Sequence, residues 1–107
     1  MESLSEKHCV PCHGGVPRLT GEEVEPLLAQ LEGWEAVGVH HLSKEYRFKN
    51  FADALAFVNR VGRVAESEGH HPDISFGWGY ARVEIYTHAI DGLSESDFIL
   101  AARIDAA

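Results

Sequence analysis

The sequence reads NFADALAFVNRVGRVAESEG from residue 50 to residue 69. Its apolar residues recur every three or four positions, which is the period of one helix face; they are Phe51, Ala54, Leu55, Val58, Val61 and Ala65. Asn50 can cap the first turn, Asp53 adds a carboxylate to that turn, and Gly69 suits the left-handed position that ends many helices. The pattern predicts a helix over residues 50–69, and the fold can be built outward from it.

The segments on both sides of this helix carry the pattern of strands. Before it, residues 34–39 and 41–48 are rich in aromatic and β-branched side chains, with Lys44 the one break in the apolar face of the second segment. After it, two segments show apolar or β-branched residues that alternate with polar or small ones, and a turn with two glycines lies between them. The alternating residues are Ile74, Phe76 and Trp78 in the first segment and Val83, Ile85 and Thr87 in the second, and the glycines are Gly77 and Gly79. The sequence therefore predicts four strands in two hairpins.

Two further helices are expected at the ends of this core. Thr20 and Glu23 form a capping-box pattern ahead of leucines at helical spacing, which predicts a helix over residues 20–31. Ser94 and Asp97 repeat the pattern before the apolar residues that lead to the C-terminus. The order α-β-β-α-β-β-α indicates an α+β fold, in which three helices cover one face of a four-stranded antiparallel sheet.

The length of 107 residues favours a single domain. We assign residues 20–107 to it and treat residues 1–19, which are rich in Cys, His, Gly and Pro, as an irregular N-terminal arm. The arm contains CVPCH at residues 9–13, a match to the covalent haem attachment pattern. Because no export signal precedes the motif, we reject haem and favour free thiols at Cys9 and Cys12, with a zinc or redox role as the minor alternative.

Charge and composition exclude some classes of function. Seventeen Asp and Glu against nine Lys and Arg give a formal net charge of −8, and no basic block offsets it. Such a balance repels phosphate backbones and anionic membrane surfaces, so we expect neither direct nucleic-acid binding nor membrane association. The first residues lack the basic start and apolar stretch of an export signal, and no segment approaches the roughly 20 apolar residues of a membrane span. We therefore expect a cytoplasmic protein.

Histidine exchanges protons near neutral pH, and the chain has seven histidines. His70 and His71 stand between the predicted helix end and Pro72, at a helix-to-strand joint of the kind that often carries function. His88 is expected to end the fourth strand on its polar face, where a buried structural role is less natural. A lone histidine is more often a plain surface or hydrogen-bonded residue, so the case for these three depends on their neighbours.

Three further side chains could assist these histidines. Glu66 lies four residues before His70, close enough to orient that ring and to favour its protonated form, although a solvated helix end explains it equally well. Asp97 stands in the first turn of the third helix, where capping alone would explain it. Trp78 supplies an aromatic ring in the third strand.

Taken together, these residues resemble the signature of the pterin-4a-carbinolamine dehydratases. The matching residues are ESEGHHP at 66–72, the aromatic Trp78, the pair Thr87-His88, the run Gly92-Leu93-Ser94, and Asp97, with every interval kept. The predicted order of helices and strands, from about residue 19 to the C-terminus, is also similar to that family's α+β fold. The resemblance implies dehydration of 4a-hydroxytetrahydropterin to quinonoid dihydropterin, which recycles the pterin cofactor of aromatic amino acid hydroxylases without a metal or a bound cofactor.

The resemblance also implies roles for the individual residues. The catalytic set is His70, His71 and His88, and the substrate-binding or orienting set is Glu66, Trp78 and Asp97. Within these sets we expect His70, tuned by Glu66, and His88 to act as the acid–base pair, while His71 contacts the substrate. Spacing does not fix which of the two is the acid. Ile74 stands where some relatives have an aromatic residue, which removes one stacking contact with the pterin.

Two other functions compete with this interpretation. A metal hydrolase could use the three histidines and Glu66 as zinc ligands, but adjacent histidines usually diverge and no helix carries a pair of histidine ligands, so we expect no metal. A non-catalytic protein-binding module is the second alternative, because the same family in animals also serves as a dimerisation cofactor of a transcription factor. We further expect a homo-oligomer, either a dimer or a tetramer, with a hydroxylase as a further partner.

Overall fold

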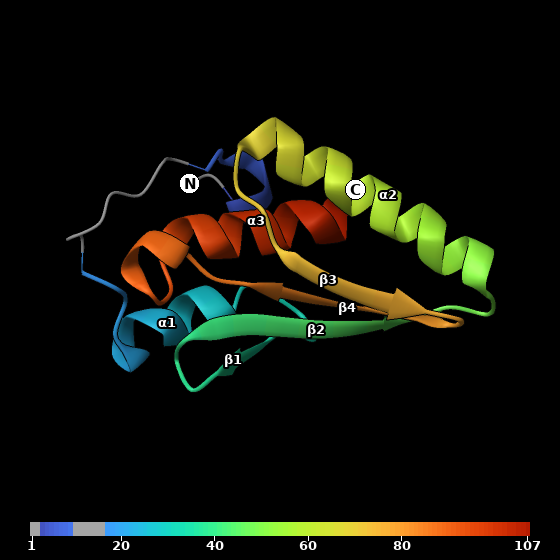
Figure 1. The fold of residues 1–107 in the computed structure, drawn as a ribbon. Coiled ribbons are helices and arrows are strands. Elements are labelled where there is room, and N and C mark those ends of the chain that lie inside the picture. Colours follow the sequence, from blue (N-terminus) through green and yellow to red (C-terminus); the bar gives the residue numbers. More distant parts are fainter. Residues whose placement is uncertain (1–2, 10–16) are drawn as a thin grey trace.

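The computed structural model describes residues 3–9 and 17–107 (Figure 1). Its elements in chain order are η1 (Leu4–Glu6), α1 (Gly21–Leu28), β1 (Glu35–Val37), β2 (His41–Arg47), α2 (Phe51–Glu68), β3 (Asp73–Gly77), β4 (Tyr80–Ile85), η2 (His88–Ile90) and α3 (Glu95–Ala106). Apart from the two short 3₁₀ turns, the order is α-β-β-α-β-β-α. The predicted α+β fold is confirmed.

The four strands form one antiparallel sheet in the order β1-β2-β4-β3. The two predicted hairpins are therefore joined through their second strands, with Leu42 of β2 opposite Ile85 of β4. These two residues, Ala81 and Val83 are fully buried. They point towards the layer formed by α2 and α3, which run across the same side of the sheet (Figure 1).

Helix α2 has the predicted ends. The Asn50 side chain accepts a hydrogen bond from the Asp53 amide at 2.8 Å, and Gly69 ends the helix in the left-handed conformation with φ 63°. The buried stripe is narrower than the predicted one, however, because Phe51 and Leu55 remain 46% and 39% exposed. An apolar patch is therefore left on the surface where α2 begins.

The structure shortens several predicted elements. Helix α1 ends at Leu28 and not at residue 31, because the amides of Gln30 and Leu31 bond to carbonyls three residues back in a tighter turn. Strand β1 ends at Val37, where Gly38 and Val39 both take left-handed φ values. The fourth strand was predicted to reach His88, but β4 ends at Ile85 and His88 begins η2.

The N-terminal arm was predicted to be irregular, yet Leu4–Glu6 form a short 3₁₀ helix in which Leu4 is buried. The Cys9 amide donates to Glu68 at 2.8 Å, and its thiol donates to the Ser96 carbonyl at 3.4 Å. Residues 3–9 thus pack against the end of α2 and against α3. The remainder of the CVPCH motif, and with it the test of a zinc or redox role, lies outside the described residues.

The contacts of the arm change the acidity of two groups. Burial raises the pKa of Glu68, but the Cys9 amide, His8 and Arg103 outweigh this effect and hold that pKa below its usual range. Burial, followed by the negative charge of Glu68, raises the pKa of the Cys9 thiol to about 12. The Cys9 thiol is therefore protonated at neutral pH, and the reactive thiolate is not populated.

Lys44, the break in the apolar face of the second predicted strand, belongs to a polar cluster around Asp105 of α3. The Asp105 carboxylate accepts hydrogen bonds from Trp34 Nε1 at 2.8 Å, Lys44 Nζ at 3.1 Å and the Tyr46 hydroxyl at 2.5 Å. Burial raises the pKa of Tyr46, and the hydrogen bond and charge of Asp105 raise it further. One carboxylate therefore ties the C-terminal helix to β2 and to Trp34, which directly precedes β1.

We predict that Asp105→Ala lowers the free energy of unfolding by about 2 to 3 kcal/mol, since it leaves the buried Trp34 N–H and the Tyr46 hydroxyl without their acceptor. Urea denaturation followed by tryptophan fluorescence measures the change. Glu25→Ala removes an exposed carboxylate from α1 and serves as the control. Equal stability of the two variants would contradict the role given to Asp105.

Candidate functional site

Asp97 is the buried centre of the predicted site. Its side chain is fully buried, and its two oxygens accept hydrogen bonds from three elements. Oδ2 accepts from the Ser94 amide and from the Thr87 hydroxyl, both at 2.8 Å, and Oδ1 bonds to His70 Nε2 at 2.5 Å. One carboxylate therefore caps α3 and also bonds to the His70 ring.

The bond from Asp97 fixes the state of the His70 ring. A carboxylate can only accept, so Nε2 carries the proton, and in the neutral ring Nδ1 is the proton acceptor. His70 is held where its backbone amide bonds the Ala65 carbonyl at the end of α2, and its side chain is only 16% exposed. A histidine oriented in this way by a buried acid is suited to accept a proton and to stabilise the resulting positive charge.

The sequence-based pairing of Glu66 with His70 was wrong. Glu66 Oε1 lies 3.2 Å from His71 Nε2, and both side chains are largely exposed. Gly69, in the left-handed conformation, changes the direction of the chain directly after α2. As a result, His70 faces α3, and the His71 side chain points back to the last turn of α2. The adjacent histidines therefore diverge, as expected, with His70 bonded to Asp97 and His71 bonded to Glu66.

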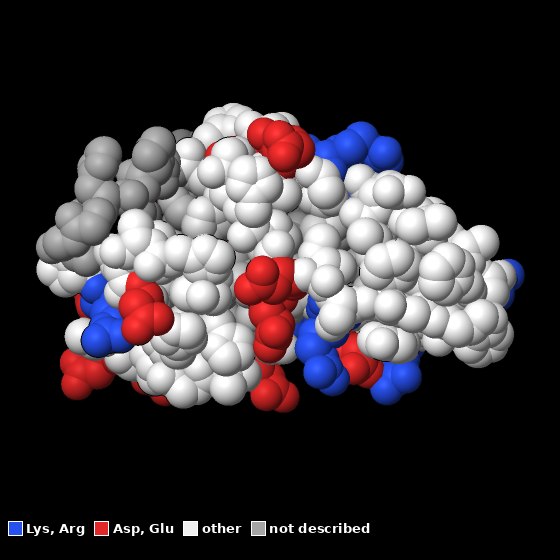
Figure 2. Space-filling view, viewed as in Figure 1, with Lys and Arg blue, Asp and Glu red and all other residues white. Residues whose placement is uncertain are grey.

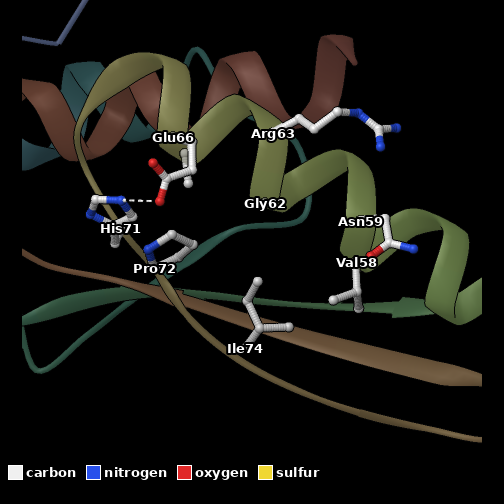
Figure 3. Close-up of a pocket in the computed structure, with 9 residues that line it drawn as sticks. Val58, Asn59, Gly62, Arg63, Glu66, His71, Pro72 and Ile74 are labelled. Carbon is white, nitrogen blue, oxygen red and sulfur yellow. Dashed lines mark hydrogen bonds and ion pairs between the residues drawn. The ribbon is translucent and has the colours of Figure 1, made fainter.

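His71 and Glu66 line a cavity of about 660 Å³ between α2 and the start of β3 (Figure 3). Val58 and Gly62 of α2 form part of one wall, and Pro72 and Ile74 form part of the other. Figure 3 shows the His71–Glu66 pair at one end of this cavity and the apolar side chains along it. Its volume and its mixture of an apolar wall with a few polar groups are those of a small-molecule site.

His88 and Trp78 occupy opposite ends of β4. His88 is exposed at the start of η2, directly after Thr87, whose hydroxyl binds Asp97. The loop that carries His88 is therefore tied to the acid that orients His70. Trp78 lies in the β3–β4 turn, is 72% exposed, and does not line the cavity. The structure thus links His88 to the His70–Asp97 pair and leaves Trp78 apart from it.

Thr87 is a site residue to which the sequence analysis gave no role. It is 5% exposed and donates to Asp97, and it also contacts the Ser94 hydroxyl at 2.9 Å. The alternation of Val83, Ile85 and Thr87 in the sequence already indicated that the Thr87 hydroxyl lies on the buried face of the strand. A buried hydroxyl needs a partner, and the nearest acid on the third helix could have been inferred from that requirement.

Residues 3–9 and 17–107 also bear on metal sites and membrane spans. Among these residues, no group of three or more His, Cys, Asp or Glu side chains is arranged to hold a metal ion. No helix in the same ranges combines the length and the apolar character that crossing a bilayer requires.

Comparison with known families and curated proteins gives consistent matches. The model of a family described as pterin 4 alpha carbinolamine dehydratase matches residues 17–107. A protein of Rubrobacter xylanophilus is 61% identical over 105 residues, which are 98% of each chain, and one of Alkaliphilus metalliredigens is 48% identical over 106 residues, 98% of this chain and 96% of the other. Both are named as candidate pterin-4-alpha-carbinolamine dehydratases.

Two solved structures are also similar. A transcriptional coactivator/pterin dehydratase from Brucella melitensis is 30% identical, with a TM-score of 0.77 over 83% of this chain and 96% of that one. A pterin dehydratase-like protein identified as a RuBisCO assembly factor in the alpha-carboxysome is 31% identical, with a TM-score of 0.54 over 62% of this chain and 76% of that one. The second match shows that a related fold also serves in protein assembly.

We predict that Asp97→Asn changes the protonated nitrogen of His70. The amide has a single acceptor oxygen, so its nitrogen would face either His70 or the Ser94 and Thr87 donors. We expect a fall of about 2 to 3 kcal/mol in the free energy of unfolding, together with a shift of the His70 ring towards the Nδ1-protonated form. Chemical denaturation and ring ¹⁵N chemical shifts measure the two effects.

Glu95→Gln is the matched control for this prediction, because Glu95 is in the same helical turn but is exposed and contacts only Lys7 in the described residues. A His70 ring with unchanged ¹⁵N shifts in Asp97→Asn would show that Asp97 caps α3 without orienting the histidine.

Proposed function

Because the chain belongs to the pterin-4-alpha-carbinolamine dehydratase family, we propose that it converts a 4a-hydroxytetrahydropterin to the quinonoid dihydropterin and water. The family model and the names of the relatives support this reaction class. The observation that carries the proposal is the 2.5 Å bond between His70 and the buried Asp97, because it gives one family histidine a defined proton-accepting nitrogen.

The reaction requires two proton transfers. The bond between carbon 4a and the hydroxyl oxygen breaks as that oxygen receives a proton and leaves as water, and a ring nitrogen loses its proton as the new carbon–nitrogen double bond forms. We assign these transfers to His70 and His88. Asp97 bonds to Nε2 of His70 and leaves Nδ1 as the acceptor, so we assign His70 as the base and His88 as the acid.

We assign one part of the pterin to the cavity between α2 and β3, with its reacting atoms extending beyond the cavity towards His70 and His88, which do not line it. His71 and Glu66 offer polar groups at one end, and Pro72 and Ile74 offer an apolar wall for a flat ring system (Figure 3). His71 would contact the substrate directly, and Glu66 would orient His71. Trp78 lies at the far end of the β3–β4 hairpin, so we assign it to contacts between subunits in place of its expected role in substrate binding.

Pterin recycling also has implications for partners and location. The substrate class points to an aromatic amino acid hydroxylase as the source of the hydroxylated pterin. The acidic composition, with a net charge of −8, accords with a cytoplasmic enzyme that does not bind nucleic acid. No metal or bound cofactor is needed in this scheme, because both transfers use imidazole groups.

A non-catalytic role in protein assembly is the second candidate. It is favoured by the solved structure of a pterin dehydratase-like RuBisCO assembly factor, which has a similar fold. Turnover separates the two candidates, because an assembly factor has no need to accelerate dehydration.

We predict that the protein accelerates dehydration of 4a-hydroxytetrahydropterin, and that His88→Ala lowers the rate by about 10² to 10⁴ by removing a general acid–base group. Since His88 is exposed, its loss should change the free energy of unfolding by no more than about 0.5 kcal/mol. Stopped-flow absorbance measures the rate, and a thermal melt measures the stability.

His8→Ala is the control, because His8 is an exposed histidine outside the family spacing. A wild-type rate equal to the uncatalysed one would overturn the proposed function and favour the assembly role. An active wild type with His88→Ala as active as His8→Ala would instead remove His88 from the mechanism.

We also propose that the chain forms a homo-oligomer through an apolar end of the molecule. Phe51 and Leu55 are exposed at the start of α2, Trp78 is exposed in the β3–β4 turn, and the Phe51 and Phe76 rings lie 5.6 Å apart. Figure 2 shows that the surface over this part of α2 and β3 carries little charge. Association would remove these side chains from water.

We predict that multi-angle light scattering at micromolar concentration reports a dimer or a tetramer, and that the double variant Leu55→Glu with Trp78→Ser shifts it to a monomer. Glu22→Lys, an exposed change on α1, should leave the mass unaltered. A monomeric wild type would contradict the proposed interface.

A further inference from the structure

The rings of His40, Tyr86 and His88 lie side by side. Of these three residues, only His88 belongs to the family pattern. The His40 and Tyr86 rings have centroids 4.7 Å apart, and the Tyr86 and His88 rings have centroids 4.2 Å apart. His40 comes from the β1–β2 turn, whereas Tyr86 and His88 lie directly beyond β4. Tyr86 therefore lies between a histidine assigned to catalysis and one to which the sequence gives no role.

His40 is also the centre of a hydrogen-bonded row of side chains. Its Nε2 lies 2.8 Å from Asp91 Oδ1, and its Nδ1 lies 3.1 Å from His41 Nδ1. His41 Nε2 in turn lies 3.5 Å from Glu84. The Asp91 carboxylate can only accept, so His40 Nε2 is the donor in that contact, and the two Nδ1 atoms are joined by one hydrogen bond. The row fixes the plane of the His40 ring from both of its nitrogens.

Asp91 closes the turn that carries His88. The η2 turn begins at His88 and ends at Asp91, which takes a left-handed conformation with φ 47°. Val39, next to His40, also has a left-handed φ of 55°, which is costly for a β-branched residue. Arg18 donates to the Asp91 carbonyl at 2.9 Å, and the hydrogen bond from His40 holds the pKa of Asp91 below its usual range. The His40–Asp91 contact thus joins two turns that each contain a residue in the left-handed conformation.

We propose that His40 is a positioning residue for His88. It holds Asp91, which closes the η2 turn, and it supports the Tyr86 ring, which packs against the His88 ring. His88 is exposed and would otherwise sample several rotamers, so these two contacts restrict it to the geometry that proton transfer requires. The inference rests on the proposed function of His88 and adds a residue that does not touch the substrate.

Three variants of His40 separate the effect of its hydrogen bond to Asp91 from the effect of its contact with the Tyr86 ring. His40→Ala removes both of them, His40→Phe keeps a ring against Tyr86 without the bond to Asp91, and His40→Gln keeps a donor near Asp91 without the ring. We expect His40→Ala to lower kcat about 10-fold to 100-fold, as small displacements of catalytic groups do, and to change KM less than about 2-fold. Each of the two partial replacements should recover part of the lost kcat.

A second measurement reports the position of His88 without turnover. The ¹H–¹³C resonance of the His88 ring, assigned by its loss in His88→Ala, carries the ring-current shift of Tyr86 at 4.2 Å. In His40→Ala it should move towards the value of an exposed histidine. Arg82→Ala is the control, because Arg82 of β4 pairs with Glu45 of β2 and is not among the contacts of Tyr86, His88 or Asp91 within the described residues.

The outcomes separate this proposal from the proposed function. A moved His88 resonance together with a lower kcat in His40→Ala, both absent from Arg82→Ala, supports positioning by His40. An unmoved resonance, or a moved one with unchanged kcat in an active protein, overturns it. If the wild-type protein has no turnover, the dehydratase proposal fails, and the resonance alone still decides whether His40 holds His88.

Discussion

The buried Asp97 carboxylate is the contact on which the other parts of the site depend. Burial of a charged group away from water costs free energy unless the group is hydrogen-bonded. The donors to Asp97 come from the segment after α2, the segment after β4 and the start of α3. Two of these donors concern the family histidines directly, because one is His70 itself and another is Thr87, the neighbour of His88. The requirement to satisfy one buried acid therefore brings three separate segments together at the place where chemistry is proposed.

The three family histidines consequently stand in different surroundings. His70 is mostly buried and bonded to a buried acid, His71 is exposed and bonded to an exposed acid, and His88 is exposed and packed against an aromatic ring. These partners and exposures differ although the three side chains are chemically equal. In the proposed mechanism the three imidazoles therefore take the separate roles of base, acid and binding group.

The sequence predicted the features that depend on neighbouring residues, and it did not predict contacts between distant parts of the chain. The period of α2 and its ends at Asn50 and Gly69 depend on neighbours within four residues, so pattern and capping chemistry suffice. The partner of Glu66 depends on the direction in which the left-handed Gly69 turns the chain, which spacing along a helix does not contain. The pairing of β2 with β4, which brings His40 beside Tyr86, joins residues far apart in the chain and has no local signal at all.

The two functions known for this fold need not compete for the same surface. Helix α2 has 18 residues and is about 27 Å long at 1.5 Å per residue. Its last turn carries Glu66 and leads to the histidines, whereas its first turn exposes Phe51 and lies near the turn that holds Trp78 (Figure 1). Because the proposed proton-transfer groups lie beyond the last turn of α2 and the apolar patch lies at its first turn, a protein bound at the patch would leave the proposed catalytic site uncovered. Loss of the histidines in a relative would then remove catalysis and leave assembly intact, which gives a physical route from a dehydratase to an assembly factor.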